Sequence, residues 1–290
     1  MIRQFDLALP SGITLACRGA GAGRVRALLL HGFPEAAFVW DDVLQRLAPH
    51  AAAVAPNLRG YIGSSAPTDV LAYRAKHLVG DIVAAIDALG APLDLLVAHD
   101  WGGALAWNLA AQWPQKIKRL LIINSPHPAT FLRELRHSPA QQAASAYMTF
   151  LCRDDAAVRL AEDHFRRLWP FLGDPPWLTP PVRAQYEDAW HNQGRGLTGA
   201  LNYYRASPLR PPTGADDPLH QLQLPDAAVT SRVPTTVLWG ERDAALQPAL
   251  LTGLERWVPQ LQLVRVPEAS HWILHEEPAQ VAELILSLLR

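Results

Sequence analysis

Short runs rich in Leu, Ile, Val and Ala recur along the chain, and most of them end in a turn that carries polar residues or proline. The runs lie at residues 27–30, 51–55, 93–98, 119–123, 235–239 and 261–266. Nearly continuous apolar runs of this length are typical of parallel strands that are buried on both faces of a sheet. Because helical patterns separate them, the sequence predicts an α/β fold with a mostly parallel, doubly wound sheet.

Helical periodicity is clearest between the second and third runs. Ile82, Ile86 and Leu89 recur at the spacing of one helix face, which predicts a crossover helix there. Further helices are predicted over residues 103–112, 248–257 and 278–290. The last of these places Val281, Leu284, Ile285 and Leu288 on one apolar face.

The composition changes after residues 126–128. From there to about Pro225 the chain is rich in Trp, Arg and Pro, has helical stretches and lacks a strong strand pattern. A helical block that interrupts an α/β pattern is typical of a cap inserted into a core domain. We therefore expect a core domain over residues 1–126 and 226–290, with a helical cap over residues 127–225.

Charge and cysteine content narrow the classes of partner. The chain has 26 Lys and Arg against 27 Asp and Glu and no basic run, so we expect neither a nucleic-acid nor a membrane partner. The two cysteines, Cys17 and Cys152, form no disulfide framework, which favours a reducing compartment. The first residues lack a signal-peptide pattern, and no apolar run approaches the roughly 18 residues of a membrane span. A soluble, cytoplasmic monomer or homodimer is the expectation.

The turn after the run at 93–98 carries the candidate nucleophile, Asp100. A tight strand-to-helix turn crowds its central residue, and the small residues Ala98 and Gly102 at the −2 and +2 positions relieve that crowding. The N–H groups at the start of the following helix favour a negative charge at this position. An isolated Asp before a helix is more often only an N-cap. The small neighbours and the motifs described next favour the nucleophile.

Three motifs together resemble those of the epoxide hydrolase branch of the α/β-hydrolase family. They are residues 31–35 (HGFPE), 59–61 (RGY) and 99–103 (HDWGG), and the resemblance extends over essentially the whole chain, cap included. It implies an α/β-hydrolase core in which Asp100 attacks an alkyl carbon and becomes an ester. Haloalkane and haloacid dehalogenases share an Asp nucleophile, so the turn alone does not separate these activities.

Hydrolysis of such an ester needs a general base and an acid that orients it. His271 stands just past the last strand, where the family has its catalytic His, and His275 is the local competitor. Asp243 follows the run at 235–239 and matches the family's acid, with Glu241 as its rival. Some relatives place the acid after the preceding strand, where this chain has the uncharged Asn124.

The resemblance also implies an oxyanion hole and part of a substrate pocket. The two donors would be the backbone N–H groups of Trp101, after the nucleophile, and of Phe33, between Gly and Pro. Pro34 matches a family proline that is often cis, which turns the Phe33 N–H inward. For the substrate pocket we predict His31, Pro34, Trp101 and Met148 as lining residues.

Two cap tyrosines bear on the type of reaction. Tyr147 and Tyr204 lie in segments that resemble those where epoxide hydrolases carry their ring-opening tyrosines, and Tyr203 is the neighbour most easily confused with Tyr204. Opening an epoxide places negative charge on its oxygen, and a neutral phenol with a pKa near 10 donates a hydrogen bond and then a proton to it. The alternative is that both are ordinary packed tyrosines.

The sequence therefore predicts a cofactor-free and metal-free enzyme that converts a small-molecule epoxide and water into a vicinal diol. A dehalogenase is the first alternative. Haloalkane dehalogenases have Asn where this chain has Phe33, and fluoroacetate dehalogenases have Arg where it has Trp101, although haloalkane dehalogenases share that Trp as a halide donor. A non-catalytic ligand-binding protein with a hydrolase fold is the second alternative, and the presence of Asp100, Asp243 and His271 together argues against it.

Overall fold

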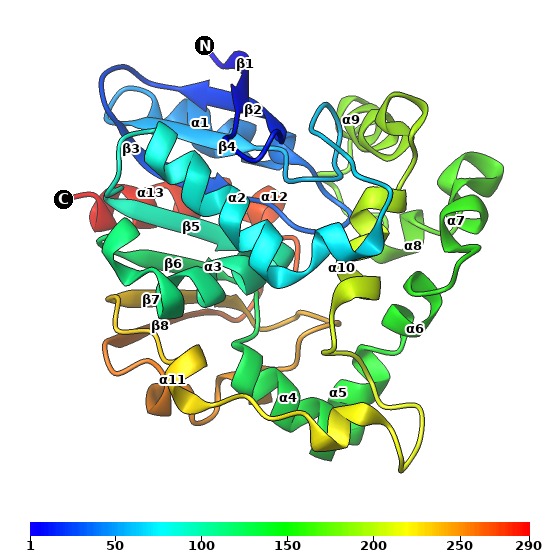
Figure 1. The fold of residues 1–290 in the computed structure, drawn as a ribbon. Helices are drawn as coiled ribbons and strands as arrows, with labels where there is room; N and C mark the ends of the chain where they lie inside the picture. Colours follow the sequence, from blue (N-terminus) through cyan, green and yellow to red (C-terminus); the bar gives the residue numbers. More distant parts are fainter.

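An eight-stranded sheet forms the centre of the protein, whose residues 1–290 are described by a computed structural model (Figure 1). The strands are β1 (Arg3–Ala8), β2 (Thr14–Ala20), β3 (Val25–Leu30), β4 (Ala52–Pro56), β5 (Leu95–His99), β6 (Leu120–Ile123), β7 (Thr235–Gly240) and β8 (Leu261–Val266). Their order across the sheet is β1-β2-β4-β3-β5-β6-β7-β8. Strand β2 is antiparallel to both of its neighbours, and every other pair is parallel. The predicted α/β class with a mostly parallel sheet is confirmed.

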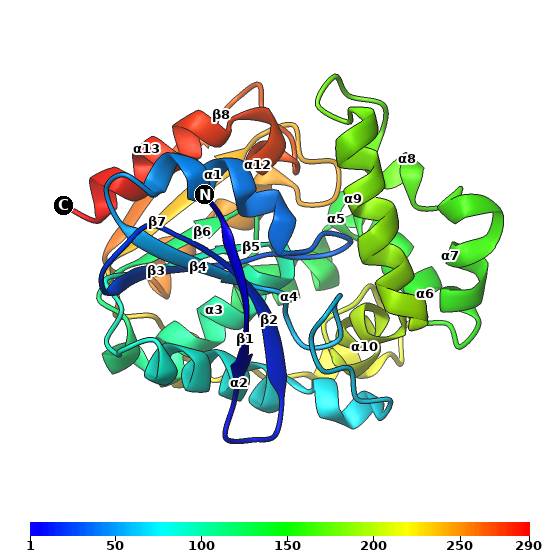
Figure 2. The same ribbon diagram turned by 90° about the horizontal axis from the view of Figure 1, so that it is seen from above.

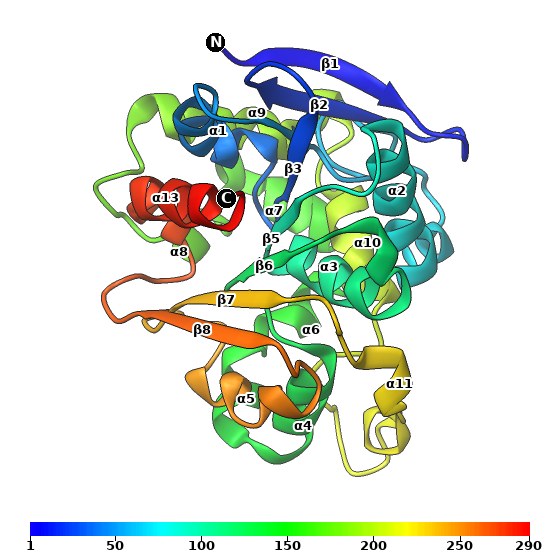
Figure 3. The ribbon, with the colours of Figure 1, turned by 90° about the vertical axis from the view of Figure 1, so that its left-hand side faces the viewer.

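Helices cover both faces of the sheet. One face carries α1 (Asp41–Leu47), α12 (Ile273–Glu276) and α13 (Pro278–Leu288), and the other carries α2 (Ala75–Ala88) and α3 (Asp100–Gln112). Figure 3 shows α1 and α13 on the opposite side of the strands from α2 and α3. Successive side chains of a strand point to opposite faces. Val97 of β5 therefore packs in the core beneath α1 and α13, whereas its neighbour Ala98 packs in the core beneath α2 and α3.

Each predicted apolar run coincides with one of the strands β3 to β8. The sequence did not indicate β1 and β2, because β1 is exposed along nearly its whole length and shows no buried-strand pattern. The helix predicted over residues 248–257 is wrong. That segment forms two short 3-10 turns, η6 (Pro248–Leu251) and η7 (Leu254–Arg256), separated by Gly253 at a φ of 74°. A positive φ interrupts the helical backbone there.

Between β6 and β7 the chain contains helices and turns but no strand. The helices are α4 (Pro128–His137), α5 (Pro139–Ala144), α6 (Tyr147–Leu151), α7 (Ala156–Phe165), α8 (Trp169–Leu172), α9 (Pro180–His191), α10 (Thr198–Ala206) and α11 (Asp226–Val229). Figures 1 and 2 both show α6 to α9 gathered to the right of the sheet. Helix α10 lies close to the end of β5. The ring centroid of Tyr204, on α10, is 5.0 Å from that of Trp101, which follows β5 at the start of α3. The helical segment therefore lies against the turn that carries Asp100.

The remaining elements are short 3-10 turns. The turns are η1 (Ala37–Trp40), η2 (Val70–Tyr73), η3 (Pro114–Lys116), η4 (Asn192–Gly194) and η5 (Pro218–Gln221). Cys17 is buried and Cys152 is half-buried, and both are free thiols. None of the helices combines the length and the apolar character that a bilayer crossing requires.

Candidate active site

The backbone at Asp100 has the geometry of a strained turn. Asp100 has a φ of 48°, at the point where β5 ends and α3 begins. A Cβ on Gly102 would lie 2.6 Å from Leu30 Cβ and 2.7 Å from the His31 carbonyl oxygen, so only glycine fits there. The Asp100 carboxylate does not cap its own helix. Its Oδ1 instead accepts the backbone N–H of Phe33 at 2.7 Å.

Gly32 makes room for this carboxylate. A Cβ on Gly32 would lie 2.2 Å from Asp100 Oδ1, far inside van der Waals contact. The adjoining Phe33–Pro34 peptide bond is cis, as the family resemblance implied. The second predicted donor, the N–H of Trp101, lies in the first turn of α3 and has no acceptor within the protein. Of the two predicted donors, the Phe33 N–H is thus engaged by the Asp100 carboxylate, and the Trp101 N–H is free.

His271 lies on the other side of the carboxylate. Its Nε2 is 3.8 Å from Asp100 Oδ2, which is beyond hydrogen-bond distance. Its Nδ1 donates to Asp243 Oδ2 at 2.6 Å. The His271 and Asp100 side chains are only 11% and 15% exposed, and that of Asp243 is fully buried. The structure thus places the predicted base, His271, between the predicted nucleophile, Asp100, and the predicted acid, Asp243.

Asp243 is held by four hydrogen bonds. Its Oδ1 accepts the backbone N–H groups of Ala245 at 2.8 Å and Leu246 at 2.9 Å. Its Oδ2 accepts Nδ2 of Asn124 at 2.8 Å, in addition to His271. Asn124 also receives the Gly240 N–H and donates to the Gly240 carbonyl, so it ties the end of β6 to the end of β7. From the sequence, Asn124 is only the uncharged residue at the alternative position of the acid, and its place directly after a strand is the signal for this role.

The charges of the pair support each other. Burial alone raises the pKa of Asp243, but the charge and hydrogen bond of His271, followed by Asn124, hold the pKa below its usual value. For His271 burial lowers the pKa, and the carboxylates of Asp243 and Asp100 overcome this effect and raise the pKa to about 9. The imidazole is therefore protonated at neutral pH.

The competing residues lie elsewhere. His275 Nε2 pairs with the Tyr186 hydroxyl at 2.8 Å and is 3.9 Å from Glu35 Oε1, and its ring stacks on Trp177. Glu241 pairs with an arginine of β8 at 2.7 Å, on the surface. Neither rival faces the Asp100 carboxylate or the His271 ring.

A second buried network lies behind His271, and the sequence analysis did not identify it. His99 Nε2 contacts the His271 carbonyl oxygen at 3.0 Å, and His99 Nδ1 contacts Glu35 Oε2 at 2.9 Å. Burial raises the pKa of Glu35, but the nearby His99 outweighs this effect and lowers the pKa below its ordinary value. The network fixes the backbone that carries His271. Glu35 and His99 belong to the motifs at residues 31–35 and 99–103, but the sequence analysis assigned no role to either residue.

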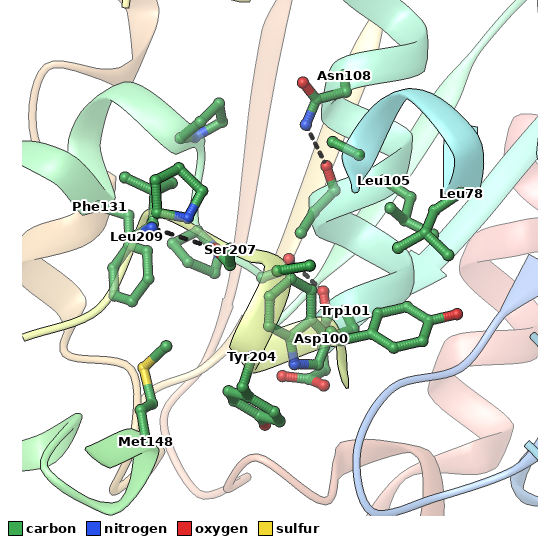
Figure 4. Close-up of a pocket in the computed structure, with 18 of the residues that line it drawn as sticks. Leu78, Asp100, Trp101, Leu105, Asn108, Phe131, Met148, Tyr204, Ser207 and Leu209 are labelled. Carbon is green, nitrogen blue, oxygen red and sulfur yellow. Dashed lines mark hydrogen bonds between the residues drawn. The ribbon is translucent and has the colours of Figure 1, made fainter. Parts of the chain in front are cut away.

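A cavity of about 270 Å³ opens in front of Asp100 (Figure 4). Trp101, Tyr147, Met148 and Tyr204 line it together with Asp100, and most of the other lining residues are apolar. His31 and Pro34 lie outside this lining, contrary to our prediction. The His31 ring is buried and its Nε2 accepts the Leu58 N–H at 3.1 Å, while the Pro34 carbonyl accepts the indole N–H of Trp190 at 2.7 Å. Both therefore hold loops together behind the cavity wall.

The two predicted tyrosines face each other in the cavity, with ring centroids 6.2 Å apart. Burial, followed by nearby Asp100 for Tyr147 and by Tyr147 itself for Tyr204, raises the pKa of each phenol above its ordinary value. Both phenols are therefore protonated donors. Tyr203 differs, because its hydroxyl already donates to the Arg59 carbonyl at 2.9 Å. This hydrogen bond distinguishes Tyr203, whose hydroxyl is engaged, from its neighbour Tyr204.

No group of three or more His, Cys, Asp or Glu side chains is arranged to hold a metal ion. The site is thus built from a carboxylate, an imidazole paired with a second carboxylate, two backbone amides and two phenols. Such a set can form an ester on the first carboxylate and hydrolyse it.

Comparison with known proteins identifies the family of this chain. The family model described as "alpha/beta hydrolase fold" matches residues 28–278. The AB hydrolase superfamily protein YfhM of Bacillus subtilis is 35% identical over 97% of this chain and 96% of that protein. Epoxide hydrolase 3 of Xenopus tropicalis is 31% identical over 91% of this chain and 71% of that protein. The crystal structure of Bacillus megaterium epoxide hydrolase with an inhibitor superposes with a TM-score of 0.89, at 31% identity, over 98% of this chain and 99% of the other.

Proposed function

Since this chain belongs to the α/β-hydrolase family and, within it, to the epoxide hydrolases, we propose that it opens a small-molecule epoxide to a vicinal diol through an ester on Asp100. The observation that carries the proposal is that Asp100, Tyr147 and Tyr204 line one cavity and that His271 Nε2 lies 3.8 Å from Asp100 Oδ2. The nucleophile therefore lies at the cavity that would hold the substrate and close to the base.

In the first step the free oxygen of Asp100 attacks an epoxide carbon. Oδ1 is held by the Phe33 N–H at 2.7 Å, whereas the nearest charged partner of Oδ2 is the His271 ring at 3.8 Å. We therefore assign Oδ2 as the attacking atom. The new bond joins Oδ2 to carbon, the carbon–oxygen bond of the epoxide breaks, and the released oxygen takes a proton from Tyr147 or Tyr204. The raised pKa of both phenols keeps that proton available.

In the second step water cleaves the ester. Esterification removes the charge of Asp100, which is one of the causes that raise the pKa of His271 to about 9. The pKa of His271 then falls, its proton passes through water to the tyrosinate left by the first step, and the neutral Nε2 becomes able to take a proton from water. The water oxygen attacks Cγ of Asp100, and Oδ1 carries the resulting negative charge between the N–H groups of Phe33 and Trp101. Collapse breaks the bond between Cγ and Oδ2, and the departing oxygen takes the proton from His271 to complete the diol. The proton of the new Asp100 carboxyl group then returns to the imidazole, which restores the starting charges.

The helical segment supplies the two phenols, from α6 and α10. We therefore propose that residues 127–225 act as a cap, which closes the cavity over the core and contributes the acid side of the reaction. The core contributes Asp100, His271 and Asp243.

The test is a trapped intermediate. His271→Gln should form the ester and fail to hydrolyse it, so incubation with styrene oxide should add the mass of one substrate molecule to the intact protein. Asp100→Ala should show no adduct and no diol, with an unchanged melting temperature. Absence of any adduct on the His271 variant, across a panel of epoxides that the wild type converts, would overturn the two-step scheme.

A dehalogenase would use the same nucleophile, and Trp101 lines the cavity beside it. Incubation of the wild type with a bromoalkane, scored for released bromide, separates the two reactions. Replacing both Tyr147 and Tyr204 by Phe should abolish diol formation and leave any bromide release largely intact, because a departing halide needs no proton.

A further inference from the structure

The cavity at Asp100 is elongated along one helix. From α3 its lining takes Asp100, Trp101, Ala104, Leu105 and Asn108, which is the spacing of a single helix face. From Asp100 to Asn108 the helix rises by about 12 Å, at 1.5 Å per residue. Figure 4 shows Asn108 at the opposite end of this face from Asp100. The space available to a substrate therefore follows the helix axis away from the nucleophile.

The lining contains a single formal charge, that of Asp100 itself. Figure 4 shows Phe131, Met148 and Leu209 on the wall across from α3. No Lys, Arg or His borders the cavity, so a carboxylate on the substrate would meet no cation and would be buried near the Asp100 charge. This composition selects neutral, largely apolar chains.

Asn108 is the exception at the far end. Its Nδ2 donates to the Ala104 carbonyl at 2.8 Å, and its Oδ1 and second amide hydrogen have no partner within the protein. The hydroxyls of Tyr73 and Tyr203 donate to backbone carbonyls, and that of Ser125 donates to the Asp100 carbonyl. Ser207 Oγ accepts the Leu209 N–H and keeps only its donor. Asn108 thus keeps both a donor and an acceptor for a ligand.

We propose that this site takes elongated, neutral epoxides whose far end carries a hydrogen-bonding group, such as a hydroxyl, that Asn108 binds. The inference rests on the proposed epoxide hydrolysis and names its substrate class. Asn108 is the specificity-determining residue for the polar end, and the small side chain of Ala104 keeps the middle of the cavity open.

The first experiment compares 9,10-epoxydecan-1-ol with 1,2-epoxydecane, whose extended chains are close to the rise of about 12 Å from Asp100 to Asn108 along α3. Asn108→Leu should lower the ratio of kcat/KM for the alcohol over that for the alkane about fivefold, the effect of one lost hydrogen bond. The wild type should convert 9,10-epoxydecanoic acid about tenfold less efficiently than the alcohol, because the carboxylate has no cation to pair with. An unchanged ratio in the Asn108 variant, or an acid converted as well as the alcohol, overturns the inference.

The second experiment tests the direction of the cavity. Ala104→Leu should lower the ratio of kcat/KM for 1,2-epoxydecane over 1,2-epoxybutane by about tenfold or more, since the added side chain blocks the middle of the cavity. Ala111→Leu is the matched control, because Ala111 lies on the same helix outside the lining, and that ratio should stay at the wild-type value. The inference is refuted if this ratio of kcat/KM is the same in the Ala104 and Ala111 variants. If the wild type fails to convert even 1,2-epoxybutane, the proposed function itself is refuted.

Discussion

Replacing Asp243 by Asn tests how the base is oriented. The carboxylate accepts two backbone N–H groups at Oδ1 and the His271 and Asn124 side chains at Oδ2. An Asn has only one acceptor oxygen. If that oxygen keeps the backbone amides, its NH2 group faces the NH2 group of Asn124 and Nδ1 of His271. The imidazole then accepts at Nδ1 and carries its proton on Nε2, toward Asp100. In that tautomer it cannot take a proton from water.

The size of the effect follows from the pKa of His271. A rise from the ordinary value of 6.5 to about 9 corresponds to roughly 3 kcal/mol in favour of the imidazolium. Asp243 supplies the largest favourable part of that rise. In a Ser-His-Asp triad the same replacement lowers kcat by about 10⁴-fold through the wrong tautomer. We expect ester hydrolysis to slow by about 10³-fold to 10⁴-fold, and ester formation to change by less than about tenfold, because Asp100 and the two phenols are untouched.

The assay is a single-turnover reaction, stopped at short times and followed by mass measurement of the intact protein. The Asp243→Asn variant should accumulate the Asp100 ester almost completely, whereas the wild type clears it. Glu241→Gln is the control, because Glu241 pairs with Arg265 at the surface and should behave as the wild type. If the Asp243 variant clears its ester at the wild-type rate, the orientation argument is refuted.

Three other perturbations probe the site. Tyr204→Phe should lower kcat/KM for an epoxide by about 10²-fold, whereas Tyr203→Phe should chiefly lower the melting temperature, since its hydroxyl bonds a backbone carbonyl; the reverse pattern would contradict the assignment. The raised pKa of His271 adds stability that is full below pH 6.5 and lost as pH rises through about 9. Urea unfolding should therefore show a decline of up to about 3 kcal/mol over this window, and His271→Gln should flatten it; a wild type without the decline would refute the pairing. Gly32→Ala should reduce turnover by about 10³-fold or more, because its Cβ would lie 2.2 Å from Asp100 Oδ1, and retained activity in a folded variant would show that the carboxylate can move.

The features that depend on residues close together in the sequence were predictable from it. Strands β3 to β8 are continuous apolar runs, and burial of both faces of a parallel sheet requires such runs. The turn at Asp100 needs small residues two positions away on either side, and Ala98 and Gly102 supply them. The exposed strand β1 and the break at Gly253 escaped prediction, because neither leaves a local apolar pattern.

For neighbouring candidates the family resemblance favoured one residue of each pair, and the tertiary structure gives the physical difference between them. Tyr203 and Tyr204 are adjacent in the sequence, and the hydrogen bond of the Tyr203 hydroxyl to the Arg59 carbonyl distinguishes them. The roles of Asn124 and of the Glu35–His99 pair depend on strands that are distant in the chain and adjacent in the sheet. Local patterns thus determine which segments fold into strands, helices and the turn at Asp100. Which side chains meet there is decided by packing, because each contact joins residues whose separation in sequence carries no information about their distance in space.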